Sequence, residues 1–95
     1  MRQYEVAYIV HPELDETAFK DINERIAALI TDNDGKIEKA ELWGKKKLAY
    51  EIRKQTEGQY VFLKATLPPS FCVELERNLR LMEPVMRHMI LQVED

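Results

Sequence analysis

The residues best suited to chemistry lie in one segment, WGKKKLAYEIRK, which runs from Trp43 to Lys54. Lys45, Lys46 and Lys47 provide cations for phosphate groups, and an aromatic residue beside cations is typical of a binding hot spot or a base-stacking contact. In an extended strand, alternation sends Lys46 to one face and the other two lysines to the opposite face. Two alternatives stay open: the lysines protect a sheet edge, and Trp43 folds back onto the core.

Patterns for enzymatic or metal chemistry are missing elsewhere in the sequence. His11 and His88 lie far apart without a metal-ligand pattern, and Cys72 lies on an apolar helical stripe where a buried thiol is the ordinary outcome. Turns or a bulge explain the glycines Gly35, Gly44 and Gly58, and a helix-ending turn explains the acidic residues Asp32, Asp34 and Glu38. We therefore expect no enzyme, no catalytic residue, no metal ion and no cofactor.

Composition limits the size and the setting of the protein. A chain of 95 residues with 45% hydrophobic content is enough for one core, so residues 1–95 are expected to form a single domain. The formal charge of -3 gives no global attraction to nucleic acid or to membranes, so any phosphate binding must be local. The single cysteine, the absence of a signal-peptide pattern and the absence of a long apolar run indicate a cytoplasmic protein without membrane contact.

Hydrophobic periodicity predicts the elements that position these residues. Alternation of period two predicts strands, spacings of three and four predict helices, and turn residues separate them. Asp15 is expected to cap the first helix, with Leu14 and Phe19 as a hydrophobic staple. The expected elements are a strand at 4–10, a helix from 15 to 30, a strand at 36–53 broken at Gly44, a polar turn at 54–58, a strand at 60–67, a helix that begins at Pro68-Pro69-Ser70 and closes at Pro84, and a strand at 85–93 of ambiguous parity.

The order β-α-β-β-α-β predicts an α+β fold, the ferredoxin-like sandwich, in which two helices cover one face of a four-stranded antiparallel sheet. Right-handed crossovers place the first and third strands in the centre. The opposite, open face is expected to carry Glu5, Ala7, Tyr60, Phe62, Lys64, Arg87 and Met89. Because this face is unusually apolar and lacks the glycine-rich aromatic signature of RNA recognition motifs, we expect a protein partner there. The predicted partner-binding residues are Leu42, Trp43, Tyr60, Phe62 and Met89.

The whole chain resembles the bacterial small-subunit ribosomal protein S6 family. The most specific match is the run Gly44-Lys45-Lys46-Lys47-Leu48-Ala49-Tyr50-x-Ile52, and further matches are Met1-Arg2-x-Tyr4-Glu5, Leu14-Asp15, Gly58-x-Tyr60, Leu67-Pro68, Leu75-x-x-x-Leu79-Arg80 and Val85-x-Arg87. Glu51 departs from the proline of many members, and the sequence ends at Asp95 without the charged tail of some members, so functions of that tail are not expected.

The resemblance implies a structural component of the bacterial small ribosomal subunit. Such proteins pair with ribosomal protein S18 and bind the central domain of 16S ribosomal RNA with it. Matched residue by residue, the resemblance implies RNA contacts from Arg2, Lys45, Lys46, Lys47 and Arg87. It implies a location on the ribosome and no small-molecule substrate.

Two other functions remain as alternatives. One is a ferredoxin-like regulatory domain that binds a small molecule. The other is an enzyme of the acylphosphatase kind, which needs an arginine in the loop after the first strand, where this chain has His11-Pro12-Glu13.

Overall fold

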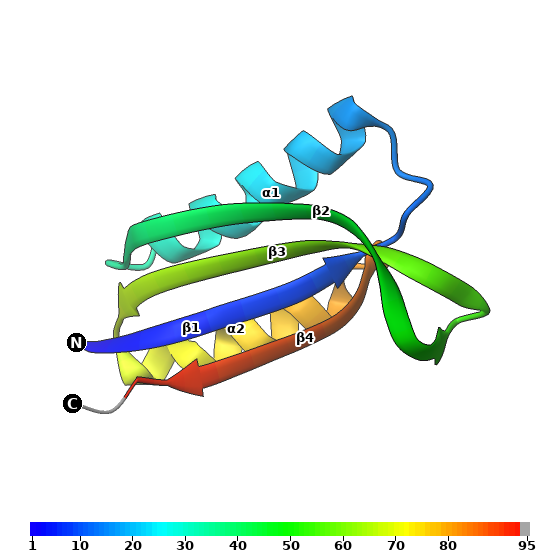
Figure 1. The fold of residues 1–95 in the computed structure, drawn as a ribbon. Coiled ribbons are helices and arrows are strands. Elements are labelled where there is room, and N and C mark those ends of the chain that lie inside the picture. Colours follow the sequence, from blue (N-terminus) through cyan, green and yellow to red (C-terminus); the bar gives the residue numbers. More distant parts are fainter. Residues whose placement is uncertain (94–95) are drawn as a thin grey trace.

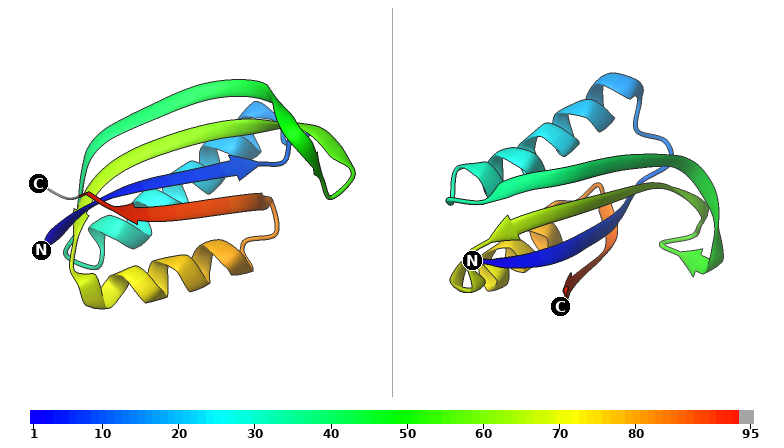
Figure 2. Two further views of the ribbon diagram at one scale, coloured as in Figure 1. Left: turned by 60° about the horizontal axis from the view of Figure 1, so that its bottom comes forward. Right: turned by 60° about the vertical axis from the view of Figure 1, so that its left-hand side comes forward.

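The computed structural model describes residues 1–93, and over that range the chain forms four strands and two helices in the predicted order (Figure 1). The elements are β1 (Arg2–Val10), α1 (Glu16–Thr31), β2 (Lys36–Ile52), β3 (Gln55–Leu67), α2 (Pro69–Leu81) and β4 (Val85–Gln92). The strands form one antiparallel sheet in the order β2-β3-β1-β4, and both helices cover the same face (Figure 2). The ferredoxin-like α+β fold, with β1 and β3 in the centre, is therefore confirmed.

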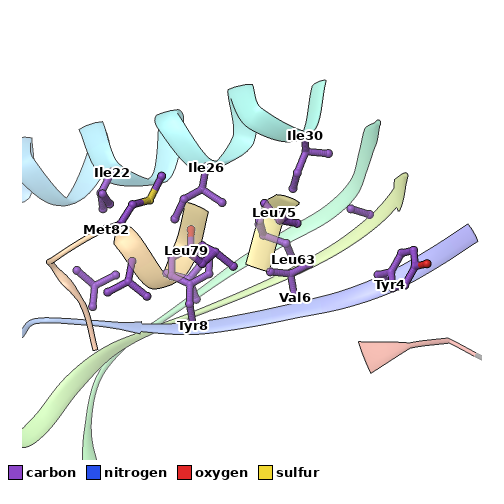
Figure 3. Packing of buried hydrophobic residues seen from close by; sticks show 14 of the residues in the cluster. Tyr4, Val6, Tyr8, Ile22, Ile26, Ile30, Leu63, Leu75, Leu79 and Met82 are labelled. Carbon is purple, nitrogen blue, oxygen red and sulfur yellow. The ribbon is translucent and has the colours of Figure 1, made fainter. Parts of the chain in front are cut away.

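The core lies between the helices and one face of the central strands (Figure 3). Its members alternate along the strands and recur at helical spacing along α1 and α2, as the sequence predicts: Tyr4, Val6, Tyr8, Val10, Val61, Leu63, Ala65 and Leu67 from the sheet, and Ile22, Ile26, Ile30, Leu75 and Leu79 from the helices. The buried Tyr8 hydroxyl donates a hydrogen bond of 2.7 Å to Asn23 Oδ1. This bond satisfies the one polar atom that Tyr8 brings into the core.

Both helices begin where the sequence predicts, but for different reasons. Asp15 caps α1, because its carboxylate accepts a hydrogen bond of 2.8 Å from the Ala18 backbone N–H. At α2 the N-cap is Pro68, with φ −65° and ψ 135°, and Pro69 follows as the first helical residue. Proline geometry rather than the Ser70 hydroxyl therefore defines the start of α2. Among residues 1–93, neither helix is long and apolar enough to cross a membrane.

The hairpin of β2 and β3 differs from the prediction at its tip. The break at Gly44 is confirmed, because Gly44 has φ 78° and the register shifts between Leu42 and Gly44. The predicted turn at 54–58 is wrong: β3 begins at Gln55, and the turn consists of Arg53 and Lys54 with φ values of 50° and 64°. Two consecutive residues of positive φ are typical of a two-residue hairpin turn, and here neither is glycine.

The register of β4 settles the parity that the sequence left ambiguous. Ile9 of β1 lies opposite Arg87, and Ala7 lies opposite Met89. Arg87 and Met89 thus lie on the open face with Leu91, while His88 and Ile90 lie on the helix side, opposite Tyr8 and Val6.

Candidate functional site

On the open face, three rows of residues run across all four strands. Directly paired residues project to the same side of an antiparallel sheet, so the register defines each row. From the N-terminal end of β1 onward, the rows are Lys39-Lys64-Glu5-Leu91, then Glu41-Phe62-Ala7-Met89, then Gly44-Tyr60-Ile9-Arg87. The seven residues predicted for this face all lie in these rows. The central strands and β4 are apolar in the middle row, and the charged residues lie in the two outer rows and, with Glu41, at the β2 edge.

Trp43 lies on the open face rather than in the core. It is the extra residue of the bulge before Gly44, and its indole ring stacks on Phe62 with 5.9 Å between ring centroids and 9° between ring planes. Its Nε1–H donates a hydrogen bond of 3.0 Å to Glu41 Oε2, while Lys39 Nζ lies 3.2 Å from Glu41 Oε1. The indole hydrogen bond, then Lys39, hold the pKa of Glu41 below its usual value. Trp43 is still 49% exposed, so one side of the stack is free for a partner.

Two shallow hollows lie side by side on the open face. The first, of about 130 Å³, lies between the Trp43-Phe62 stack and β4. The second, of about 280 Å³, lies under the end of the hairpin and is lined by Leu48, Tyr50 and Ile52. Both hollows share Ile9, Tyr60, Arg87 and Met89, so they form one continuous surface. It is mainly apolar, and Met89 is 51% exposed at its border.

Four of the five predicted RNA-binding residues lie toward one end of the sheet. Lys45, Lys46 and Lys47 directly follow Gly44, which is in the same row as Arg87. The ion pairs formed among residues 1–93 use Lys20, Lys39, Arg80 and His88, and they leave the three lysines unpaired. The Arg87 guanidinium lies over the Tyr50 ring, 5.5 Å from its centroid.

Arg2 does not join this group of cations. It pairs with Leu67 at the opposite end of the sheet, and it has the parity of the helix-side residue Tyr4. Ile9, the partner of Arg87, lies seven residue steps along β1 from Arg2, which corresponds to roughly 24 Å along the strand. The structure therefore places Arg2 and Arg87 on neighbouring strands but not in one site.

Leu42 is likewise separated from the other predicted partner-binding residues. It pairs with Val61, whose side chain is buried under the helices, so Leu42 lies on the helix side of β2. There it is 64% exposed and lines a groove of about 700 Å³ between α1 and β2. Trp43, Tyr60, Phe62 and Met89 share the open face, and Leu42 does not.

Outside the open face, the Cys72 thiol and the potential metal ligands are not arranged for catalysis or metal binding in residues 1–93. Cys72 is half-buried on α2, and burial together with Glu76 raises the pKa of its thiol, which is the reverse of what a nucleophile needs. Across residues 1–93, no group of three or more His, Cys, Asp or Glu side chains is placed to hold a metal ion.

Some residues of the open face were missed by the sequence reasoning. Ile9 continues the parity of Glu5 and Ala7, so the alternation of β1 contained the signal for it. Tyr50 had no such signal, because its position depends on an irregular register between Lys47 and Ile52.

Comparisons with known proteins agree with this geometry. The sequence profile described as ribosomal protein S6 matches residues 3–92. The small ribosomal subunit protein bS6 of Moorella thermoacetica is 39% identical over 95 residues, which cover 100% of this chain and 97% of that protein. The bS6 protein of Exiguobacterium sibiricum is 44% identical over 90 residues, 95% of each chain. The crystal structure of 30S ribosomal protein S6 from Thermotoga maritima superposes with a TM-score of 0.92 at 31% identity, over 97% of this chain and 87% of that one.

These findings settle the class of the protein. The relatives are ribosomal proteins of the small subunit, which confirms the expectations of a non-enzymatic protein and of a location on the ribosome in the cytoplasm. They give no support to the regulatory or acylphosphatase-like alternatives. The match covers the open face and the lysine segment as well as the core. The chain belongs to the ribosomal protein S6 family of the small ribosomal subunit.

Proposed function

We propose that residues 1–95 act as one domain that binds the central domain of 16S ribosomal RNA together with ribosomal protein S18. The observation that carries this proposal is the composite open face. An apolar, aromatic surface for a protein lies directly beside exposed cations for RNA: Lys46 and Arg87 have the parity of the open face, and Lys45 and Lys47 project from the other side of the same stretch of β2.

The apolar part of the open face suits a protein better than it suits RNA. One face of the Phe62 ring is already covered by Trp43, which leaves less aromatic surface for bases. Glu5 and Glu41 lie on the same face, and their carboxylates repel phosphates. Half-exposed aromatic and methionine side chains around a shallow hollow are typical of interface anchors. We assign Trp43, Tyr60, Phe62 and Met89 to the S18 contact, and Leu42 to it only where S18 reaches around the edge of β2.

The cations can hold RNA only with help from the partner. Four phosphate contacts, from Lys45–Lys47 and Arg87, correspond to a loss of about two decades of affinity between 50 and 200 mM salt. The protein as a whole carries a formal charge of -3, so it has no general attraction to RNA. Simultaneous contacts by S18 raise the effective affinity without any further cation on this chain. Arg2, at the far end of the sheet, would contact a separate phosphate.

RNA binding by the lysines is tested with a triple variant, Lys45→Gln, Lys46→Gln and Lys47→Gln, mixed with S18 and central-domain RNA. The matched control replaces three exposed cations of the helix layer: Lys20→Gln, Arg25→Gln and Arg77→Gln. The lysine variant should bind at least about tenfold more weakly and lower the salt slope by about 2.7, and the control should change neither. The proposal is wrong if the wild-type protein with S18 binds the RNA no more tightly than either protein alone.

The position of S18 is tested with single variants and no RNA. Trp43→Ala and Phe62→Ala should each weaken S18 binding by about tenfold or more, as expected for interface anchors. Leu42→Ala is the matched control, because Leu42 is exposed on the other side of β2. Equal effects of Leu42→Ala and Trp43→Ala would show that S18 wraps around the β2 edge, and an effect of Leu42→Ala alone would contradict the open-face assignment.

A further inference from the structure

The hairpin tip is a separate unit that depends on support from elsewhere. Beyond the pair Lys47 and Glu57, four residues of β2 (48–51) face the single residue Thr56 before pairing resumes at Ile52 and Gln55. The tip extends past the rest of the sheet and twists (Figures 1 and 2). A two-stranded ribbon of this kind is marginally stable by itself in water. Something must hold it against the body of the domain.

Arg53, at the turn of this hairpin, makes the contact that holds the tip. Its Nη1 donates a hydrogen bond of 2.7 Å to the Glu83 carbonyl, and its Nη2 donates one of 3.3 Å to the Val85 carbonyl. Glu83 belongs to the connection between α2 and β4, and Val85 is the first residue of β4; they lie 30 and 32 residues away from Arg53 in sequence. The carbonyl between them, that of Pro84, accepts a hydrogen bond of 2.9 Å from the His11 backbone N–H. The acceptor loop is therefore itself fixed to the end of β1.

The same bend brings the tip over β4. Tyr50, within the irregular stretch of β2, receives the Arg87 guanidinium on its ring at 5.5 Å, and Leu48 and Ile52 cover the second hollow of the open face. Arg53 and Arg87 thus make two separate contacts between the hairpin and β4 with its preceding connection. The lysines lie between this tip and the bulge at Gly44, and they pair with Gln59, Gly58 and Glu57 of β3 directly before the irregular stretch.

We infer that Arg53 is a positioning residue: its two hydrogen bonds latch the hairpin to the α2-β4 connection and so fix Lys45–Lys47 relative to Arg87. The inference rests on the proposed function, because it assigns to the latch the purpose of pre-forming the RNA-binding cations. A flexible hairpin would have to be ordered upon binding, and that ordering opposes affinity. Arginine suits the role because its planar fork donates two hydrogen bonds in a fixed geometry.

The latch is tested first in the free protein by amide hydrogen exchange. In Arg53→Gln, amides of residues 46–58 should exchange at least about tenfold faster, because two hydrogen bonds from a charged donor are lost, while amides of β1 and α1 stay unchanged. Arg53→Lys keeps the charge but not the fork, so it should give an intermediate rate. The matched control is Lys54→Gln, at the other residue of positive φ in the same turn. In this variant the amides of residues 46–58 should exchange at the wild-type rate. Equal exchange in Arg53→Gln and Lys54→Gln would overturn the latch.

The positioning role is tested by measuring the effect of Arg53→Gln on RNA affinity with and without the three lysines. Arg53→Gln should weaken RNA binding in the presence of S18 severalfold in the wild-type background, and it should have no effect where Lys45–Lys47 are already glutamine. An equal loss in both backgrounds would overturn the positioning role, because mere destabilisation does not depend on the lysines. If the wild-type protein with S18 fails to bind RNA, the proposed function and this RNA role both fall. The exchange experiment then still decides whether Arg53 holds the hairpin.

Discussion

Gly58 of β3 lies close to the Ile9 side chain, and replacing it by alanine tests the packing of the open face. Gly58 is buried and pairs with Lys46. A Cβ at this position would overlap Ile9 Cγ2, whereas Leu48 Cδ2 and the Val10 carbonyl oxygen would each lie at an ordinary 3.6 Å. The conflict therefore involves one methyl group of a β-branched side chain, which cannot move away easily because its χ1 angle is restricted.

Two opposing effects set the size of the change in stability. Overpacking of this kind costs about 1–3 kcal/mol. Gly58 does not have a positive φ, so alanine also restricts the unfolded chain and returns about 0.4–1 kcal/mol. We expect Gly58→Ala to lower the free energy of unfolding by about 1–2 kcal/mol net, measured by urea denaturation at constant slope.

The cause is isolated in a double-mutant cycle with Ile9→Ala, which removes the conflicting methyl group. In that background Gly58→Ala should be neutral or should raise the free energy of unfolding by up to about 1 kcal/mol. The coupling between the two sites should therefore be about 1–3 kcal/mol. Equal destabilisation by Gly58→Ala in both backgrounds would refute the assignment to Ile9.

Three further predictions concern strain, burial and charge. Gly44→Ala should lower the free energy of unfolding by about 1–2 kcal/mol through its φ of 78° alone, because an added Cβ meets nothing within 4 Å; Gly44→Asn should lose less in the same urea titration. Tyr8→Phe should lower the free energy of unfolding by about 1 kcal/mol at neutral pH, because it removes the hydrogen bond to Asn23. Burial raises the pKa of Tyr8 above its ordinary value of 10.0. Its contribution to the free energy of unfolding is therefore fully present below pH 10 and is lost as the pH rises further. The midpoint of urea denaturation should fall more steeply above pH 10 for the wild type than for Tyr8→Phe. Trp43→Phe should raise the pKa of Glu41 toward its ordinary value in an NMR titration, because phenylalanine can stack but cannot donate; an unchanged pKa would contradict the indole hydrogen bond as the main cause.

The regular part of the fold follows from local patterns in the sequence. The alternation of β1 predicts its buried face because a strand has a side-chain period of two, and Asp15 predicts the start of α1 because a carboxylate satisfies a free N–H there. The placement of β1 and β3 in the centre follows from the handedness of the crossovers.

The hairpin tip could not be predicted because its residue types give a misleading signal. Gly58 in a polar segment is typical of a turn, but here it permits close approach to Ile9 within a strand. The true turn consists of Arg53 and Lys54, which rarely adopt a positive φ.

The sequence predicts which face of a strand a site residue occupies, because side chains alternate. It does not predict how far apart residues lie along neighbouring strands, or where the pairing register is irregular. Tyr60 and Phe62 share the open face because strand parity requires it. Arg2 and Arg87 were grouped because their strands are neighbours, but antiparallel pairing places the two residues at opposite ends. Leu42 and Trp43 are adjacent in sequence yet lie on opposite sides of β2, as neighbours in a strand do.

The central place of β1 has a consequence for synthesis of the chain. β1 is made first, but one of its two neighbours, β4, begins only at Val85. Until that last strand has emerged, the Tyr4–Val10 side of β1 remains an unpaired and largely apolar edge, which is a template for aggregation. The sheet is therefore completed only after β4 has been synthesised, and a nascent chain held before Pro84 would need protection of β1.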